Sequence, residues 1–220
     1  SYAWYPNRDS LSYIPVYQLE NIPTFIRTTL RHEDFCNGWN ELVQLGLTDP
    51  TDRDLLVNVK TLKEWIDIKI KASGTETDTL IFIAKLPEKI QAQINYLELN
   101  KEELLPNKLM SSADILQSVI EKKLVLKAGD KDMIIMQHEI GYHLHHQDKL
   151  IQSTLVVKGE DEEHTAMAKT VGLPLGIAAK LILEGKIASK GLKIPIEKEI
   201  YEPVLMELKK HGIEFHEKVS

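Results

Sequence analysis

Two neighbouring stretches, YPNRDS at residues 5–10 and RTTLR at residues 27–31, decide how the chain begins to fold. The first predicts a turn after a short strand, Tyr2–Tyr5, because proline and asparagine favour turns. The second completes a predicted strand, Thr24–Arg31, which is rich in Thr, Ile and Phe. The chain therefore opens with two predicted strands, joined by a connection that has turn and helix signals.

Cationic and polar side chains gather at this opening. Alternation along a strand places Arg27, Thr29 and Arg31 on one face, and Arg8 and Asn7 lie in the preceding turn. Arginine is always charged, and its planar fork binds a carboxylate through two parallel hydrogen bonds. These residues indicate a site for a ligand with several carboxylates. The alternative is a pair of solvated surface arginines in ordinary salt bridges.

Bulk properties limit the class of protein. The chain has 220 residues, of which 43% are hydrophobic, which suffices for one domain or for one domain plus an appendage. Its net charge is −6 and it has no basic stripe, so we expect no nucleic-acid partner. Cys36 is its one cysteine, which fits a reducing compartment, and we expect a cytoplasmic protein. Because the chain starts at Ser1 without a leader, we expect a trimmed chain or a piece of a longer one.

Sequence periodicity predicts the α+β class, with a mixed, mostly antiparallel sheet, flanking helices and a helical C-terminal tail. Strands over Asp132–Leu144 and Leu150–Lys158 form a hairpin around residues 146–149. We place a domain boundary in the charged stretch after them, which gives a domain over residues 1–160 and a helical segment over residues 161–220. The helices predicted in the first part are Leu11–Tyr17, Asn37–Leu45, one helix or a pair over Leu55–Ile70, a helix after Pro87, and Ser111–Leu124. Leu80–Ile83 fits a strand or a buried helical turn equally well.

The longest apolar stretch is Ala166–Leu183 in the tail. Two apolar helices, His164–Val171 and Leu175–Glu184, are predicted there, with the break at residues 172–174 that contain Pro174. Two lysines interrupt the stretch, so we expect a buried helix pair and no membrane partner.

Four histidines, His138, His143, His145 and His146, fall within nine residues. A zinc-protease helix needs histidines at positions i and i+4, whereas His138 and His143 are five apart in a predicted strand. We therefore expect no metal here and keep a metal hydrolase only as a distant alternative.

A family resemblance rests on motifs in order along the chain. YPNRDS and RTTLR resemble the substrate-domain signature of saccharopine dehydrogenases. TAMAKTVGLP at residues 165–174 resembles the C-terminal signature of that family, and EIYEP at residues 199–203 continues the match. The resemblance runs from the first residue to the last and is loose over residues 45–131.

The resemblance implies an activity in lysine metabolism. The motifs look like those of the glutamate-forming oxidoreductases, which oxidise saccharopine with NAD or NADP to glutamate and 2-aminoadipate 6-semialdehyde. In that family a Rossmann domain precedes the substrate domain, and the C-terminal helices pack back towards it. Residues 1–160 would then be the saccharopine-binding domain. The chain contains no GxGxxG and no GxxxxGK[ST], so we expect the cofactor in the full-length enzyme and none bound to this chain, which alone would be inactive.

By the same resemblance, Arg8 matches the family arginine that binds saccharopine. Thr29, Leu30 and Arg31 match its second binding segment, with Leu30 acting through its backbone or through packing because it faces the other way. We add Asn7 and Arg27 as substrate-binding candidates; no catalytic, cofactor-binding or metal-binding residue is assigned. The sequence departs from the family at two places, with Thr28 where glycine is usual and His32 where tyrosine is usual. A β-branched residue in place of glycine restricts how closely ligand or backbone can approach.

Two alternatives stay open beside the saccharopine-binding domain. One is the domain of an amine dehydrogenase that acts on a carboxynorspermidine-type substrate. The other is a stand-alone binding module for a polycarboxylate amino acid. An exposed apolar face on the tail helices would favour a missing Rossmann partner or a homodimer over the stand-alone module.

Overall fold

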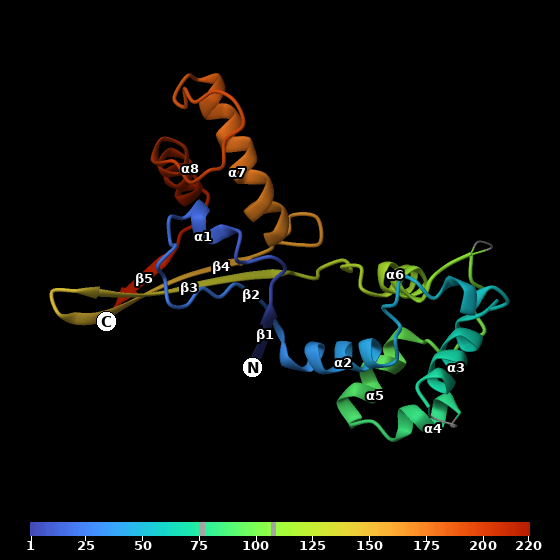
Figure 1. Ribbon diagram of the computed structural model, residues 1–220. Helices are drawn as coiled ribbons and strands as arrows, with labels where there is room; N and C mark the ends of the chain where they lie inside the picture. Colours follow the sequence, from blue (N-terminus) through green and yellow to red (C-terminus); the bar gives the residue numbers. More distant parts are fainter. Residues whose placement is uncertain (75–77, 107–108) are drawn as a thin grey trace. The chain divides into compact units, whose positions relative to one another are not determined.

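The computed structural model describes residues 1–74, 78–106 and 109–220 (Figure 1). Over these ranges the α+β prediction is confirmed, and the described strands pair in two separate antiparallel sheets. The backbone folds into two compact units. One comprises Ser1–Ser12 and Asn21–Val125, and the other comprises Tyr13–Glu20 and Leu126–Ser220. The boundary predicted after residue 160 falls inside the second unit, and the roles of the two predicted ranges remain predictions.

The first unit opens with an antiparallel ribbon of β1 (Tyr2–Pro6) and β2 (Thr28–His32). β2 begins later than the predicted strand and ends one residue beyond it. The last cross-strand bond runs from the N–H of Asn7 to the carbonyl of Arg27 at 2.9 Å, and the chain then bends away after β1. Residues before Arg27 therefore have no strand to pair with in the described part of the chain.

Helices form the rest of this unit: α2 (Glu33–Gln44), a 3-10 helix η1 (Arg53–Leu56), α3 (Leu62–Ala72), α4 (Thr79–Ala84), α5 (Glu88–Leu97) and α6 (Ser112–Lys123). The region predicted as one helix or a pair is a pair, because Thr61 and Glu64 form a capping box that begins α3 afresh. The ambiguous Leu80–Ile83 is helical, since the Asp78 carboxylate accepts the free N–H of Leu80.

The core of the first unit contains a buried polar network as well as apolar side chains. Trp65 is fully enclosed, and its indole N–H donates to the hydroxyl of Ser112 at 2.9 Å. The Asp52 carboxylate accepts hydrogen bonds from the ammonium of Lys69 and from the backbone N–H of Ser112, both at 2.8 Å. This network joins α3 to the start of α6, and each of its buried polar groups has a partner.

The second unit contains a three-stranded antiparallel sheet with the strand order β3–β4–β5. Its strands are β3 (Met133–Leu144), β4 (Gln147–Lys158) and β5 (His216–Val219), and a short helix α1 (Tyr13–Val16) belongs to the same unit. The hairpin turn is shorter than predicted: it consists of His145 and His146, both at positive φ. Two-residue hairpins favour that conformation because it matches the strand twist.

The tail contains α7 (Ala166–Leu183) and α8 (Lys198–Lys210). The prediction of two apolar helices is wrong, because α7 runs unbroken through Pro174. An internal proline costs about 3 kcal/mol. Ala166 before the proline and Ile177 and Leu181 after it are buried in one cluster with residues of β4, which offsets that cost.

The prediction that this apolar stretch is buried is wrong as well. In α7 the buried residues are Ala166, Ile177 and Leu181, whereas Leu175 is 73% exposed. By length and composition alone, α7 would also pass as a membrane span. The absence of a membrane partner stays a prediction.

Candidate functional site

The β1–β2 register assembles the predicted cationic face. Tyr5 stands opposite Thr29, and Ala3 stands opposite Arg31. Directly opposed residues of an antiparallel pair share a face, so these four side chains line the same side of the ribbon. The backbone bond between Asn7 and Arg27 continues this register by one step.

Leu30 lies on the other face, as its place in the alternation predicts. It stands opposite Trp4, which is 61% exposed. Thr28 and His32, the two departures from the family pattern, share this face with Leu30. The ring of His32 lies edge-on to that of Tyr2, with ring centroids 6.3 Å apart. Neither departure therefore lies on the face that carries Thr29 and Arg31.

Arg8 follows β1 at the bend. The N–H of Arg8 bonds to the side-chain oxygen of Asn7 at 2.8 Å, so the Asn7 carboxamide stabilises the bend itself. The Arg8 side chain is exposed, and no hydrogen bond or ion pair of its guanidinium occurs among the described residues. Whether Arg8 and Arg31 face one cleft stays a prediction.

The other two arginines make local hydrogen bonds. Arg31 donates to the carbonyl of Leu30 at 2.7 Å, and Arg27 donates to the carbonyl of Asp9 at 3.5 Å. Hydrogen bonds from Ser12 hold the pKa of the Asp9 carboxyl below its usual value, and the charge of Arg27 adds to this effect. A guanidinium has five N–H donors, so the bond of Arg31 to the Leu30 carbonyl uses one of the five.

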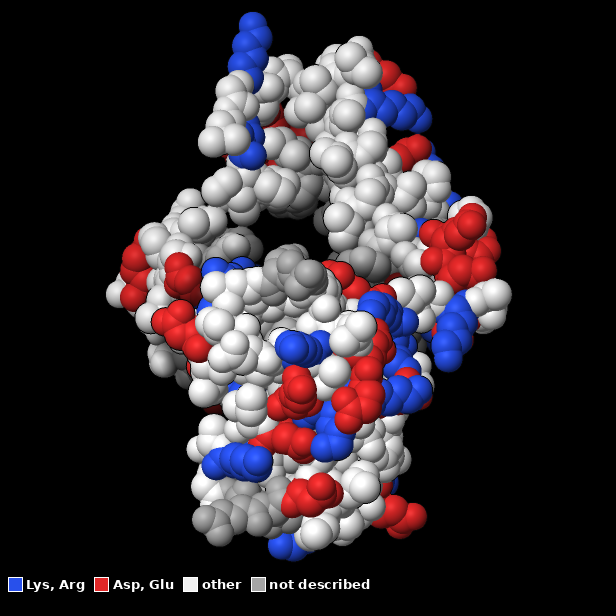
Figure 2. All heavy atoms as spheres, turned by 90° about the vertical axis from the view of Figure 1, so that its right-hand side faces the viewer, with Lys and Arg blue, Asp and Glu red and all other residues white. Residues whose placement is uncertain are grey.

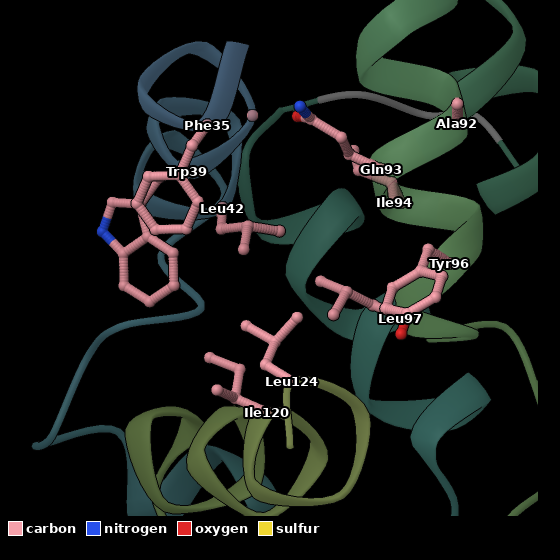
Figure 3. Close-up of a pocket in the computed structure, with 11 residues that line it drawn as sticks. Phe35, Trp39, Leu42, Ala92, Gln93, Ile94, Tyr96, Leu97, Ile120 and Leu124 are labelled. Carbon is pink, nitrogen blue, oxygen red and sulfur yellow. The ribbon is translucent and has the colours of Figure 1, made fainter. Parts of the chain in front are cut away.

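The first unit also contains an apolar pocket of about 330 Å³ between α2, α5 and α6 (Figure 3). The rings of Phe35 and Trp39 stack on one side of it, 5.8 Å apart. Its polar side chains are already bonded: Gln93 donates to the carbonyl of Asp34 and the Tyr96 hydroxyl donates to a backbone carbonyl. With no cation in its lining, this pocket does not suit a polycarboxylate.

The histidines lie along β3 and its turn, in the second unit. Alternation puts His138 and His143 on opposite faces of β3. His143 instead pairs with Asp148 across the hairpin at 3.0 Å. Over the described ranges no three His, Cys, Asp or Glu side chains form a group that would hold a metal ion. The absence of a bound metal stays a prediction.

Charge on the surface is mixed where it can be seen. On the face drawn in Figure 2, lysine and arginine side chains alternate with acidic ones rather than forming one basic stripe. This pattern agrees with the net charge of −6 and gives no support for a nucleic-acid partner on that face.

Comparison with known proteins identifies the family. Residues 1–213 match the family described as saccharopine dehydrogenase C-terminal domain, and the chain belongs to that family, as the motifs predicted. It is 36% identical to bovine (Bos taurus) mitochondrial alpha-aminoadipic semialdehyde synthase, covering 95% of this chain and 23% of the relative. It is 28% identical to the NADP(+), L-glutamate-forming saccharopine dehydrogenase of Saccharomyces cerevisiae, covering 99% of this chain and 51% of the relative.

A solved structure supports the fold over the whole chain. The apo, histidine-tagged, L-Glu-forming saccharopine dehydrogenase from Saccharomyces cerevisiae aligns with a TM-score of 0.80 at 27% identity. The alignment covers 100% of this chain and 52% of the yeast chain. The present chain thus spans about half the length of these yeast relatives.

Proposed function

We propose that this chain supplies the substrate-binding groups of a saccharopine dehydrogenase that forms glutamate and 2-aminoadipate 6-semialdehyde in lysine metabolism. One observation carries the proposal: in a chain of this family, Thr29 and Arg31 lie on the same face of the β1–β2 ribbon. Their cross-strand neighbours on that face are Tyr5 and Ala3. Saccharopine has three carboxylates. Arg8 and Arg31 would each bind one, and the Thr29 hydroxyl would orient the molecule.

We propose that the nicotinamide cofactor binds outside this chain. The sequence lacks a glycine-rich phosphate loop of either common type, and we therefore assign no cofactor-binding residue. The names of the fungal relatives specify NADP, and we propose the same cofactor for a complete enzyme that contains this domain. A cytoplasmic location is part of the proposal as well.

The apolar surface of α7 favours this proposal over a stand-alone binding module. Val171 is 64% exposed and Leu175 is 73% exposed, one helical turn apart on the same side of α7. Soluble proteins seldom leave such a continuous apolar face uncovered. We propose that a nucleotide-binding domain covers it, since the yeast relatives are about twice as long as this chain.

Saccharopine binding to the 220-residue chain tests the substrate assignment. In ¹⁵N-labelled protein, added saccharopine should shift the backbone amide signals of Thr29, Leu30 and Arg31 in a saturable way. Glutamate, with fewer carboxylates, should need a higher concentration for the same shift. If saccharopine shifts none of these amides, or only amides remote from β2, the proposed binding site is wrong.

A further inference from the structure

A pocket of about 420 Å³ with a mainly apolar lining and a few polar side chains lies between the β3–β4–β5 sheet and α8, within the second unit. Its polar side includes His138, Ser153 and Glu217, and its apolar side includes Leu205 and Phe215. None of these residues takes part in the proposed saccharopine site. The pocket is therefore a separate feature whose chemistry is unassigned.

The strand register builds the polar side of this pocket. His138 of β3 stands opposite Ser153 of β4, and Ser153 stands opposite Glu217 of β5. The three side chains thus form one row across the sheet, on the same face. Ser153 is 8% exposed, and its hydroxyl donates to the Glu217 carboxylate at 3.4 Å. The ring of His138 lies against that of Phe215, with centroids 5.6 Å apart.

The charges of the pocket do not balance. Lys209 lines it too, but its ammonium is paired with the Glu214 carboxylate. Among the described residues, Glu217 has no basic partner within ion-pair distance and accepts one long hydrogen bond from Ser153. With His138 neutral, the lining therefore carries one uncompensated negative charge beside an aromatic ring.

The adjacent row on the opposite face of the sheet is different. There, Glu139 stands opposite Gln152, and its carboxylate accepts an N–H of Gln152 at 3.1 Å and an N–H of Gln137 at 2.8 Å. The sheet thus satisfies Glu139 with its own amides, while it leaves Glu217 open towards a pocket. Glu139 provides a matched control for Glu217.

We propose that this pocket binds a primary ammonium group carried on a short aliphatic chain. The Glu217 carboxylate would take the ammonium as a charge-assisted pair, and a neutral imidazole nitrogen of His138 would accept a further N–H. The face of Phe215 adds an attraction for the cation, and Leu205 and Met206 would contact the methylene groups.

The test uses pentylammonium chloride as the probe, with 1-pentanol as its uncharged counterpart. In ¹⁵N spectra of the 220-residue chain, pentylammonium should give saturable shifts at Ser153, Phe215 and Glu217, whereas 1-pentanol should bind at least about ten-fold more weakly. Glu217→Gln should weaken pentylammonium binding by about ten-fold. Glu139→Gln should leave it unchanged.

Three results would overturn the proposal: equal affinity for pentylammonium and 1-pentanol, unchanged binding in Glu217→Gln, or equal losses in Glu217→Gln and Glu139→Gln. The same spectra report whether each variant is folded. Because the readout is at β4 and β5, its failure leaves the saccharopine assignment at β2 untouched.

Discussion

Ala3 stands directly opposite Arg31 in the β1–β2 ribbon. The Cβ atoms of such pairs lie about 4.5–5.5 Å apart. A methyl group at this position takes up less space opposite Arg31 than a larger side chain would. The Arg31 guanidinium donates one of its five N–H groups to the Leu30 carbonyl. We therefore expect a carboxylate bound to Arg31 to meet less steric obstruction from alanine than from a larger residue opposite it.

We expect Arg8→Ala and Arg31→Ala each to weaken saccharopine binding by about ten- to a hundred-fold. Each change removes a charge-assisted contact of about 1.5–3 kcal/mol. Arg8→Lys should restore binding only in part, because lysine lacks the planar fork. Isothermal titration of the chain with saccharopine measures these constants.

Arg27→Ala is the comparison for those variants, since Arg27 lies before β2 and already bonds to the Asp9 carbonyl. It should lose less affinity than Arg31→Ala. Ala3→Phe should weaken binding without removing any charge, because it places a bulky ring directly opposite Arg31. Wild-type affinity in both Arg8→Ala and Arg31→Ala would refute the assignment.

The chain alone should neither bind NADPH nor oxidise saccharopine. Hydride transfer requires cofactor and substrate in contact, and the sequence encodes no recognisable dinucleotide loop. NADPH fluorescence should not change on titration with the chain, and absorbance at the nicotinamide band should stay constant when NADP and saccharopine are added. Turnover by the purified 220-residue chain would contradict this expectation.

The buried ion pair of Lys69 and Asp52 should contribute strongly to the free energy of unfolding of the first unit. The side chains of Lys69 and Asp52 are 7% and 8% exposed, and their charged atoms are 2.8 Å apart. Asp52→Asn would leave the ammonium of Lys69 buried without a counter-charge, at a cost of about 3 kcal/mol in the free energy of unfolding. Lys122→Ala, which breaks an exposed pair with Glu103, should cost less than about 1 kcal/mol. Urea unfolding compares the two.

The same pair predicts a pH dependence of stability. Burial by itself raises the pKa of Asp52, but hydrogen bonds from Lys69 and Ser112 outweigh it and hold the pKa below its usual value. Hydrogen bonds from Lys101 and Lys123 lower the pKa of Glu98 from 4.5 to about 2. A lowered folded-state pKa gives stability that is present above the unfolded-state value and is lost as pH falls through the folded-state value.

The free energy of unfolding should therefore fall as the pH drops from about 4.5 towards 2. These two groups should change it little between pH 5 and 7, where both carboxyls are mostly ionised in the folded and the unfolded states. In Asp52→Asn the free energy of unfolding should fall less steeply over this acid range. An equally steep loss in that variant would show that Asp52 does not contribute to it.

The exposed apolar face of α7 should bind a hydrophobic dye and promote self-association of the 220-residue chain. We expect Val171→Lys together with Leu175→Lys to reduce the binding of a hydrophobic dye, and to reduce self-association if the chain dimerises through this face. The control is Leu104→Lys, which changes a 75% exposed leucine of the first unit. Sedimentation velocity measures the association state. Equal effects of the control and the α7 variants would argue against a specific docking face.

The histidine-rich hairpin should hold no metal. His138 and His143 lie on opposite faces of β3, and His143 is paired with Asp148. Elemental analysis of untagged protein should find less than about 0.1 equivalents of zinc. One equivalent of zinc, with unfolding upon chelation, would reverse this interpretation.

The sequence by itself determined the family and supplied the residues that we propose for the site. Motifs such as YPNRDS lie within a short stretch, and alternation along one strand already separated Thr29 and Arg31 from Leu30. Capping signals are equally local, which is why the start of α6 at Ser111 was predicted correctly.

The tertiary structure alone decided features that depend on distant partners. β2 could not extend back to Thr24 because its partner strand ends at the bend after Pro6. α7 could continue through Pro174 because burial of Ile177 and Leu181 against β4 offsets a local penalty that sequence rules treat as decisive. The row from His138 to Glu217 is set by strand register between segments far apart in the chain, and no local sequence signal encodes that register.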